Sequence, residues 1–164
     1  MSSNIVRMIN AAGTAVSNTT TETSMATWTV AANELQPNKL YRISGSIRST
    51  ATNSTDTLVV TIRWGTSATM SSNTSVFATT AVDQVNDDVA CFAIDLAVQS
   101  TTRAVVSGFI SDADAEGSKL LGSVYQILTV AKDTAYRLDI TATWSVANAG
   151  NSCQAESFQV VELT

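Results

Sequence analysis

The residues best suited to chemistry in this sequence are a small number of carboxylates, because the chain contains no histidine. Without histidine, neither a Ser-His-Asp triad nor a Cys-His pair can form, and no imidazole can bind a metal. Asp112, Asp114 and Glu116 alternate in the segment DADAEG, and alternating carboxylates before a turn glycine can wrap a calcium ion. A helix-loop-helix calcium loop would carry its closing glutamate where this chain has Ser123. We therefore interpret the segment as a solvated acidic loop, with a calcium loop as the alternative.

A second use of carboxylates would be a glycosidase pair, formed by Asp56 and Asp139 on either side of a sugar bond. Nothing in the sequence brings these two residues together across a cleft. A carbohydrate-active enzyme is therefore the least favoured function that we consider. We expect a non-enzymatic protein with no catalytic residue, no cofactor and no metal site.

The two cysteines and three tryptophans also have a chemical and a structural interpretation. Cys91 and Cys153 are too few for a disulfide scaffold, so we expect two free thiols, with a disulfide between them as the alternative. Trp28, Trp64 and Trp144 could stack on sugars if they were exposed. Each of them continues the apolar face of its predicted strand, which favours burial in the core.

Composition indicates a compact all-β domain with few charges. Hydrophobic residues make up 45% of the 164 residues and charged residues 14%, while Ser and Thr supply 44 positions. Threonine is β-branched and favours strands. The net charge of -5 includes no basic run, so we expect no binding to nucleic acid. No long apolar segment or secretory signal is present, so we expect a soluble chain made in a cytoplasm, with no membrane partner.

Period-two alternation predicts the strands. In DTLVVTIRWGT, every second residue from Leu58 to Trp64 is apolar, which is typical of a half-buried strand. Gly45 takes a core-facing position in a similar segment, which suggests a bulge or a close backbone approach. The segment RAVVSGFIS, residues 103–111, is apolar at both phases and predicts a strand covered on two faces. Another short strand is expected around Val76 and Phe77.

About eight such segments, with no convincing helix, predict a single-domain antiparallel β-sandwich of the jelly-roll type. The domain is expected at residues 26–164, after an N-terminal arm at residues 1–25. A helix remains an alternative in residues 81–98, where Val82, Val85 and Val89 are spaced by three and four positions.

Two segments resemble a known family. Residues 27–66, TWTVAANELQPNKLYRISGSIRSTATNSTDTLVVTIRWGT, and residues 135–163, AYRLDITATWSVANAGNSCQAESFQVVEL, are similar to a recurrent module of tailed-phage virion proteins. Such modules are jelly rolls that resemble the tumour necrosis factor and C1q type. The resemblance covers nearly half of the chain and rests on strand pattern, and no catalytic residue belongs to the motif.

The resemblance implies a structural role in a phage particle. The expected function is that of a homotrimeric capsid decoration or cement protein, which binds the major capsid protein on the virion surface after assembly in the host cytoplasm. The alternative is a tail or fibre tip protein that binds a host receptor or a glycan.

The N-terminal arm supplies the candidate contact residues. Ile5, Val6, Met8 and Ile9 place apolar side chains on a segment that a lone jelly roll would not need. Apolar residues on a terminal arm favour a partner surface. We therefore expect residues 1–20 to pack against a neighbouring subunit or the capsid shell.

Overall fold

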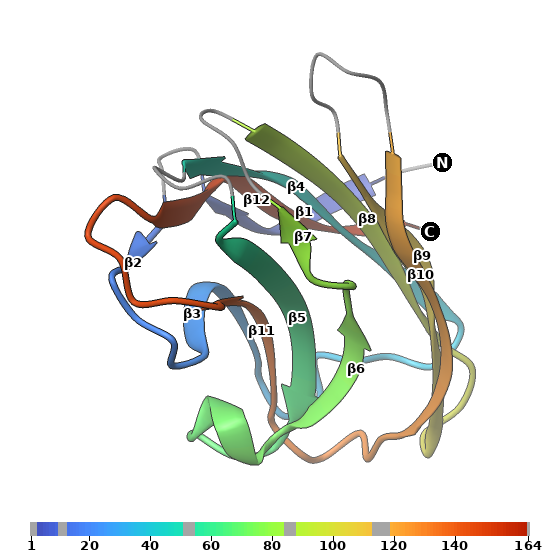
Figure 1. Ribbon diagram of the computed structural model, residues 1–164. Helices are drawn as coiled ribbons and strands as arrows, with labels where there is room; N and C mark the ends of the chain where they lie inside the picture. Colours follow the sequence, from blue (N-terminus) through green and yellow to red (C-terminus); the bar gives the residue numbers. More distant parts are fainter. Residues whose placement is uncertain (1–2, 10–12, 51–54, 84–87, 113–118, 164) are drawn as a thin grey trace.

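The chain forms two antiparallel β-sheets packed face to face (Figure 1). The computed structural model describes residues 3–9, 13–50, 55–83, 88–112 and 119–163, with backbone alone at residues 3–9 and 119–120. The larger sheet has seven strands: β1 (Ser3–Ile9), β2 (Val16–Ser17), β4 (Lys39–Thr50), β8 (Asp88–Val98), β9 (Arg103–Asp112), β10 (Lys119–Thr129) and β12 (Ser152–Leu163). The smaller sheet has five: β3 (Thr23–Val30), β5 (Thr57–Gly65), β6 (Thr74–Ala78), β7 (Val82–Asp83) and β11 (Tyr136–Trp144).

The strand pairing is that of a jelly roll, which confirms the predicted fold class. Eight strands pair as a long hairpin folded over on itself: β1 with β12, β3 with β11, β4 with β8, and β5 with β6. Successive pairs alternate between the two sheets, as expected when two Greek keys wrap into a sandwich. Strands β9 and β10 lie between the sixth and seventh of these eight, and their hairpin extends the larger sheet beyond β8.

The core forms because alternate residues of each strand point between the sheets. In β5, Leu58, Val60, Ile62 and Trp64 are all buried, as the alternation predicts. The tryptophans are also buried, which confirms the packing role predicted for Trp28, Trp64 and Trp144. The ring of Trp64 stacks on Tyr136 with centroids 4.9 Å apart. Burial of these large rings contributes much of the hydrophobic stabilisation.

Gly45 lies at the close backbone approach that its position predicted. A Cβ atom at this residue would lie 2.1 Å from the backbone oxygen of Ser157 and 2.7 Å from the ring of Phe92. The register of β12 shifts between Ala155 and Ser157, directly opposite this part of β4. The glycine therefore allows β12 and the Phe92 ring to pack against β4 at this bulge.

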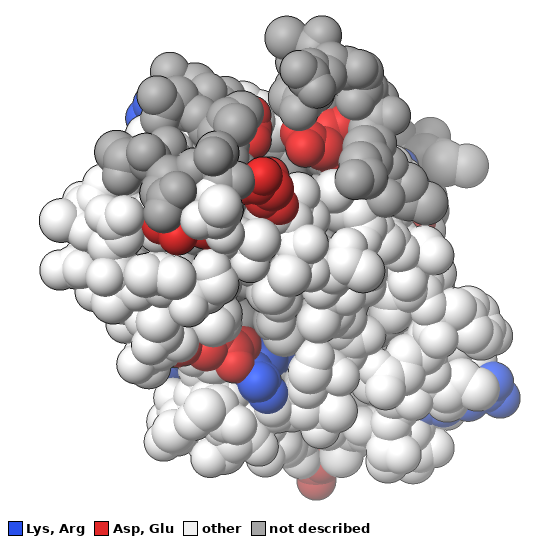
Figure 2. Space-filling model, viewed as in Figure 1, with Lys and Arg blue, Asp and Glu red and all other residues white. Residues whose placement is uncertain are grey.

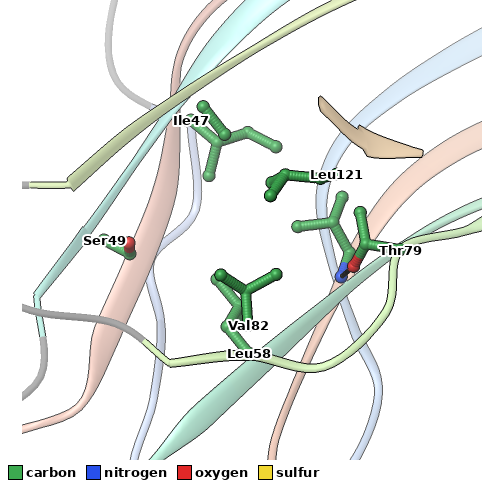
Figure 3. Close-up of a pocket in the computed structure, with 8 residues that line it drawn as sticks. Ile47, Ser49, Leu58, Thr79, Val82 and Leu121 are labelled. Atoms are coloured by element: carbon green, nitrogen blue, oxygen red, sulfur yellow. Dashed lines mark hydrogen bonds between the residues drawn. The ribbon is translucent and has the colours of Figure 1, made fainter. Parts of the chain in front are cut away.

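A small cavity lies between the two sheets, at the end of the sandwich where β7 and the start of β10 meet. Its volume is about 10 Å³, the space of about one water molecule. The labelled side chains in Figure 3 come from both sheets and surround this space. The lining residues are Ile47, Ser49, Leu58, Val60, Thr79, Val82, Ala90 and Leu121.

Two expectations are corrected. The helix alternative in residues 81–98 is wrong for the part that the structure describes, because Val82 lies in β7 and residues 88–98 form β8; residues 84–87, with Val85, lie outside the described residues. The coverage of residues 103–111 on two faces is also wrong, because Phe109 is exposed on the outer side of β9. No further layer covers that side among the described residues.

Other sequence expectations are confirmed. Cys91 and Cys153 are free thiols. Burial raises the pKa of Cys153 to about 12, which keeps this thiol protonated and inert. The short strand expected around Val76 and Phe77 is β6.

Candidate interaction surface

The outer face of the larger sheet carries an apolar row that crosses five strands. Leu163, Leu40, Ala97, Val105 and Ile127 occupy successive register positions on β12, β4, β8, β9 and β10. Paired residues of neighbouring strands lie on the same face of the sheet. Because neighbouring strands are about 4.8 Å apart, a row across five strands spans about 19 Å. At its β12 end, Leu163, Leu40 and Ala97 line an open hollow of about 690 Å³. Val105 is buried within this row, so its exposed apolar surface lies at the two ends, in the hollow and at Ile127.

Three large apolar side chains stand out from this face at the β9–β10 hairpin. Phe109, Tyr125 and Ile127 are 46%, 74% and 55% exposed. They face outward because the even-numbered residues of β9 and β10, such as Val106 and Leu128, point into the core. A contiguous exposed apolar patch of this kind marks an interaction site. We call Phe109, Tyr125 and Ile127 the hairpin patch.

The charges in the centre of this face form an internal pair. Arg42 and Asp95 are register partners, and two guanidinium nitrogens of Arg42 each donate to a carboxylate oxygen of Asp95 at 2.8 Å. This hydrogen bonding raises the pKa of Arg42 above its usual value. Neighbouring outer positions carry small residues, such as Ser44 and Ala93. The centre of this face therefore combines small side chains with a charge pair that is neutralised within the protein.

The outer face of the smaller sheet is polar by contrast. Glu22 accepts hydrogen bonds from two nitrogens of Arg63 at 2.7 and 2.6 Å and one from the Thr141 hydroxyl at 2.6 Å. The Arg63 hydrogen bonds are the main reason why the pKa of Glu22 lies below its usual value. Arg63 also donates to the backbone oxygen of Asn73 at 2.7 Å. This cluster ties the chain before β3 to β5 and β11.

A second polar cluster surrounds Asp139, whose side chain is fully buried. It accepts hydrogen bonds from Arg137 at 2.6 and 2.7 Å, from Thr27 at 2.6 Å and from Ser24 at 2.8 Å. Burial alone would raise the pKa of Asp139, but the hydrogen bonds from Arg137, Thr27 and Ser24 outweigh it and lower the pKa. The groups of both clusters bond to one another. They can stabilise this face, but they offer little to a ligand.

Acidic side chains gather at one end of the sandwich, whereas most of the surface in view is uncharged (Figure 2). Asp56, Asp83, Asp88 and Asp112 lie at strand ends there. Asp56 accepts hydrogen bonds from Asn148 at 3.3 Å and Asn151 at 2.9 Å, and the other three also have interaction partners. We assign these carboxylates to local stabilisation of the strand ends.

The carboxylates singled out in the sequence are not brought together. Asp139 is the register partner of Arg63 in β5, whereas Asp56 directly precedes β5, seven residues before Arg63. Seven residues of extended chain span about 23 Å. This excludes Asp56 and Asp139 as a glycosidase pair. Asp112 ends β9 and is buried, while Asp114 and Glu116 lie outside the described residues. No group of three or more acidic or cysteine side chains that could hold a metal occurs in the described part of the chain.

The predicted contact residues of the arm lie in β1. Ile5, Met8 and Ile9 are register partners of Val161, Gln159 and Phe158 of β12, and Val6 lies at the bulge between Ile5 and Arg7. The arm backbone therefore forms an edge strand of the larger sheet. The side chains of these four residues lie outside the described part of the structure.

Sequence reasoning missed the hairpin patch. In residues 123–130, SVYQILTV, large apolar side chains occur at both the odd-numbered and the even-numbered positions. Alternation alone therefore does not show which of the two sets faces outward. The one available signal was Gln126, a polar residue in the phase that points inward. A polar residue normally marks the exposed phase, and here it would have indicated the wrong face.

A scan against protein-family models finds no match for this chain, and a search of curated proteins finds none. Across the described residues, no helix is long and apolar enough to cross a membrane.

Proposed function

We propose that the protein is a non-enzymatic structural protein of a phage particle, a homotrimeric decoration or cement protein that binds the major capsid protein. The observation that carries the proposal is the hairpin patch on the outer face of the larger sheet. The jelly-roll fold agrees with the resemblance to virion modules. Proteins with the same fold perform many functions, so the exposed surface distinguishes this protein more than its fold does.

The size of the outer face suits a stable contact. Five strands, β12, β4, β8, β9 and β10, with about ten residues each, present a surface of roughly 24 by 33 Å, or about 800 Å². A standard protein interface buries about 800 Å² per partner. Its composition is also suitable, because small side chains such as Ser44 and Ala93 lose little entropy on burial and two of its arginines, Arg42 and Arg48, are already held in ion pairs.

Such a contact would stabilise a capsid by mass action. A protein that binds the assembled shell, and not its separated subunits, shifts the equilibrium toward the shell. A trimer repeats the same contact three times, so a weak individual contact gives a large combined effect. No bond has to be made or broken in this mechanism.

The test is binding to phage heads that lack the protein. We expect the purified chain to occupy three-fold or quasi-three-fold positions of such heads in electron cryomicroscopy. Phe109→Lys should weaken this binding by about tenfold or more, because a buried contact would receive an uncompensated charge. Val146→Lys is a matched control, because Val146 is 48% exposed against 46% for Phe109 and lies in the β11–β12 connection.

The trimer is tested separately by light scattering. We expect a particle of about three times the 17.2 kDa of the single chain. A monomer at every concentration would contradict the trimer. Bare heads at saturating protein would contradict the cement role itself.

A second candidate is a tail or fibre tip protein that binds a host receptor or glycan. Tyr125 favours it, because this ring is 74% exposed and aromatic faces stack on sugars. Heads that remain bare while the protein binds host cells, and Tyr125→Ala abolishing that cell binding, would establish this function instead.

A further inference from the structure

Strand β10 has a free edge. Within the described residues its only ladder partner is β9, and β6 of the other sheet approaches it near Gly122, where Phe77 packs. From Ser123 to Thr129, no strand of the described part of the chain lies beside the opposite edge of β10. An unpaired edge presents backbone donors and acceptors that another strand can use.

This edge lacks the features that normally protect an edge strand. The β10 ladder has a bulge at Leu121, but the part with the free edge, from Gly122 to Thr129, is regular, whereas the ladders of the long edge strands β1, β3 and β6 each contain a bulge within the paired segment. Residues 120–129 contain no charged residue and no proline. Proteins use charges, proline and bulges to prevent edge pairing. Their absence leaves β10 open to another strand.

The hydrogen bonds between β9 and β10 show which backbone N–H and C=O groups of β10 face the free edge. The backbone nitrogen of Val130 donates to the oxygen of Thr102 at 3.2 Å, and these residues continue the β9–β10 register. Even-numbered residues of β10 therefore bond to β9. The N–H and C=O groups of Ser123, Tyr125, Ile127 and Thr129 point toward the free edge, because the bonding direction alternates along a strand.

The β10 sequence is self-complementary about Gln126. When two copies pair antiparallel with Gln126 opposite Gln126, Tyr125 lies opposite Ile127, Val124 opposite Leu128, and Ser123 opposite Thr129. Every pair combines side chains of similar polarity on the same face. The ladder would contain about eight backbone hydrogen bonds, and it stops short of Gly122, where Phe77 packs.

Gln126 supplies an independent observation. Its side-chain oxygen Oε1 is buried and finds no hydrogen-bond donor among the residues that the structure describes. A buried acceptor without a donor is costly. In the register centred on Gln126, the amide of the second copy lies directly opposite and can donate to this oxygen.

We propose that β10 is a self-association edge, which pairs with β10 of a second copy about a two-fold axis at Gln126. The pairing joins two larger sheets into one continuous sheet and places both hairpin patches on the same face. This contact is independent of the virion role. It forms a dimer of single chains or, where trimers form, links one trimer to another.

The test is a site-specific disulfide in the full chain. Gln126 is in a non-hydrogen-bonded position of the proposed ladder, where Cα atoms lie about 4.5 Å apart, within the range of a disulfide. Gln126→Cys, combined with Cys91→Ala, should therefore form a covalent dimer under oxidised glutathione. Val124→Cys in the same background is the control, because its two copies would lie about 14 Å apart. Equal crosslinking of both variants, or none at Gln126→Cys, would overturn the proposal.

Hydrogen exchange of the unmodified protein gives a second readout that needs no variant. The amides of Tyr125 and Ile127 should be protected at high protein concentration and exchange at least about tenfold faster when the protein is diluted below its dissociation constant. Fast exchange at every concentration would overturn the pairing. Head binding by the same preparation is measured separately, so failure of the β10 contact and failure of the cement role are distinguishable.

Discussion

The most informative single residue for stability is Asp139, because its carboxylate is fully buried and depends on its partners. Removal of Arg137 would leave this charge with only the hydroxyl donors of Thr27 and Ser24. We expect Arg137→Ala to lower the free energy of unfolding by about 3 kcal/mol. Urea denaturation measures this change.

The matched control is Arg42→Ala in the exposed Arg42–Asp95 pair. Both arginines make bidentate contacts, but the Arg42 pair is solvated, with side chains 50% and 30% exposed. We expect a loss below about 1 kcal/mol there. Equal losses in the two variants would show that burial of Asp139 does not set the cost.

Glu22 and Asp139 also predict acid sensitivity. Both carboxyls have a pKa in the folded protein below the ordinary values of 4.5 and 3.8. The unfolded chain therefore binds more protons in acid, and the stabilisation is complete above the ordinary values and is lost as pH falls through the lower folded values. We expect the urea midpoint to fall as the pH is lowered from about 5 toward 3.

A variant of Glu22 separates this effect from general acid denaturation. Glu22→Gln cannot titrate at this position, while Arg63 keeps its hydrogen bond to Asn73. The variant should start with lower stability at neutral pH and lose less of it in acid. An unchanged slope of stability against pH would contradict the role of Glu22.

The environment of an individual residue was predictable where its strand has a clear alternation of apolar and polar residues. Burial of the tryptophans followed from the phase of their strands, and the close approach at Gly45 followed from a glycine in a core-facing phase. Phe109, Tyr125 and Ile127 could not be found in this way, because their strands are apolar at both phases. Only the register with neighbouring strands, a non-local property, decides which phase is outside.

At the scale of elements, strands with polar and apolar alternation were predictable, and β5 follows its pattern closely. In β11 the strand itself was predictable, but its polar residues Asp139 and Thr141 are buried as well, because they hydrogen-bond within the polar clusters of the smaller sheet. The β9–β10 hairpin was recognised as two strands, but not as an addition to the eight-stranded jelly roll. Its position depends on pairing with β8, which local sequence does not encode. The inserted hairpin is therefore the element that carries both the apolar patch and the free edge.

Leu121 connects this hairpin to the smaller sheet. It lies at the β10 bulge and lines the small cavity with Val82 of β7 and Leu58 of β5, as Figure 3 shows. Leu121→Ala should lower the free energy of unfolding by about 2–5 kcal/mol, because it enlarges the cavity and removes contacts across the sheets.

Ile127→Ala is the control for Leu121→Ala in the same strand. Ile127 is exposed on the outer face, so its truncation should cost less than about 0.5 kcal/mol in dilute, unassociated protein. If both truncations cost the same, β10 would not be anchored to the smaller sheet through Leu121.

At the scale of the whole molecule, the two outer faces differ in kind. The smaller sheet is covered by hydrogen-bonded charges that satisfy one another, as in the Glu22–Arg63 and Asp139–Arg137 clusters. The outer face of the larger sheet also carries ion pairs, Arg42–Asp95 and Arg48–Glu156, but it adds the exposed apolar side chains of the hairpin patch. This asymmetry is the physical basis for assigning intermolecular contacts to the larger sheet.

The N-terminal segment lies at the far edge of that same sheet, and the structure divides it into two parts. From Gly13 onward it belongs to the domain, because Gly13 donates to Ala155 at 2.7 Å and the buried Val16 accepts a hydrogen bond from Trp144 at 3.2 Å. Residues 3–9 pair with β12 alone among the ladders described. Deletion of residues 1–9 is therefore the appropriate test of the arm, whereas deletion of residues 1–20 would also damage the core.

We expect the protein without residues 1–9 to remain folded, because the seven other jelly-roll strands keep their pairing. If the arm is part of the capsid contact, its loss should weaken head binding by about tenfold or more, measured by sedimentation with heads that lack the protein. Circular dichroism establishes that the shortened chain is folded. A shortened, folded chain that binds heads with unchanged affinity would remove the arm from the contact and leave the outer face of the larger sheet as its carrier.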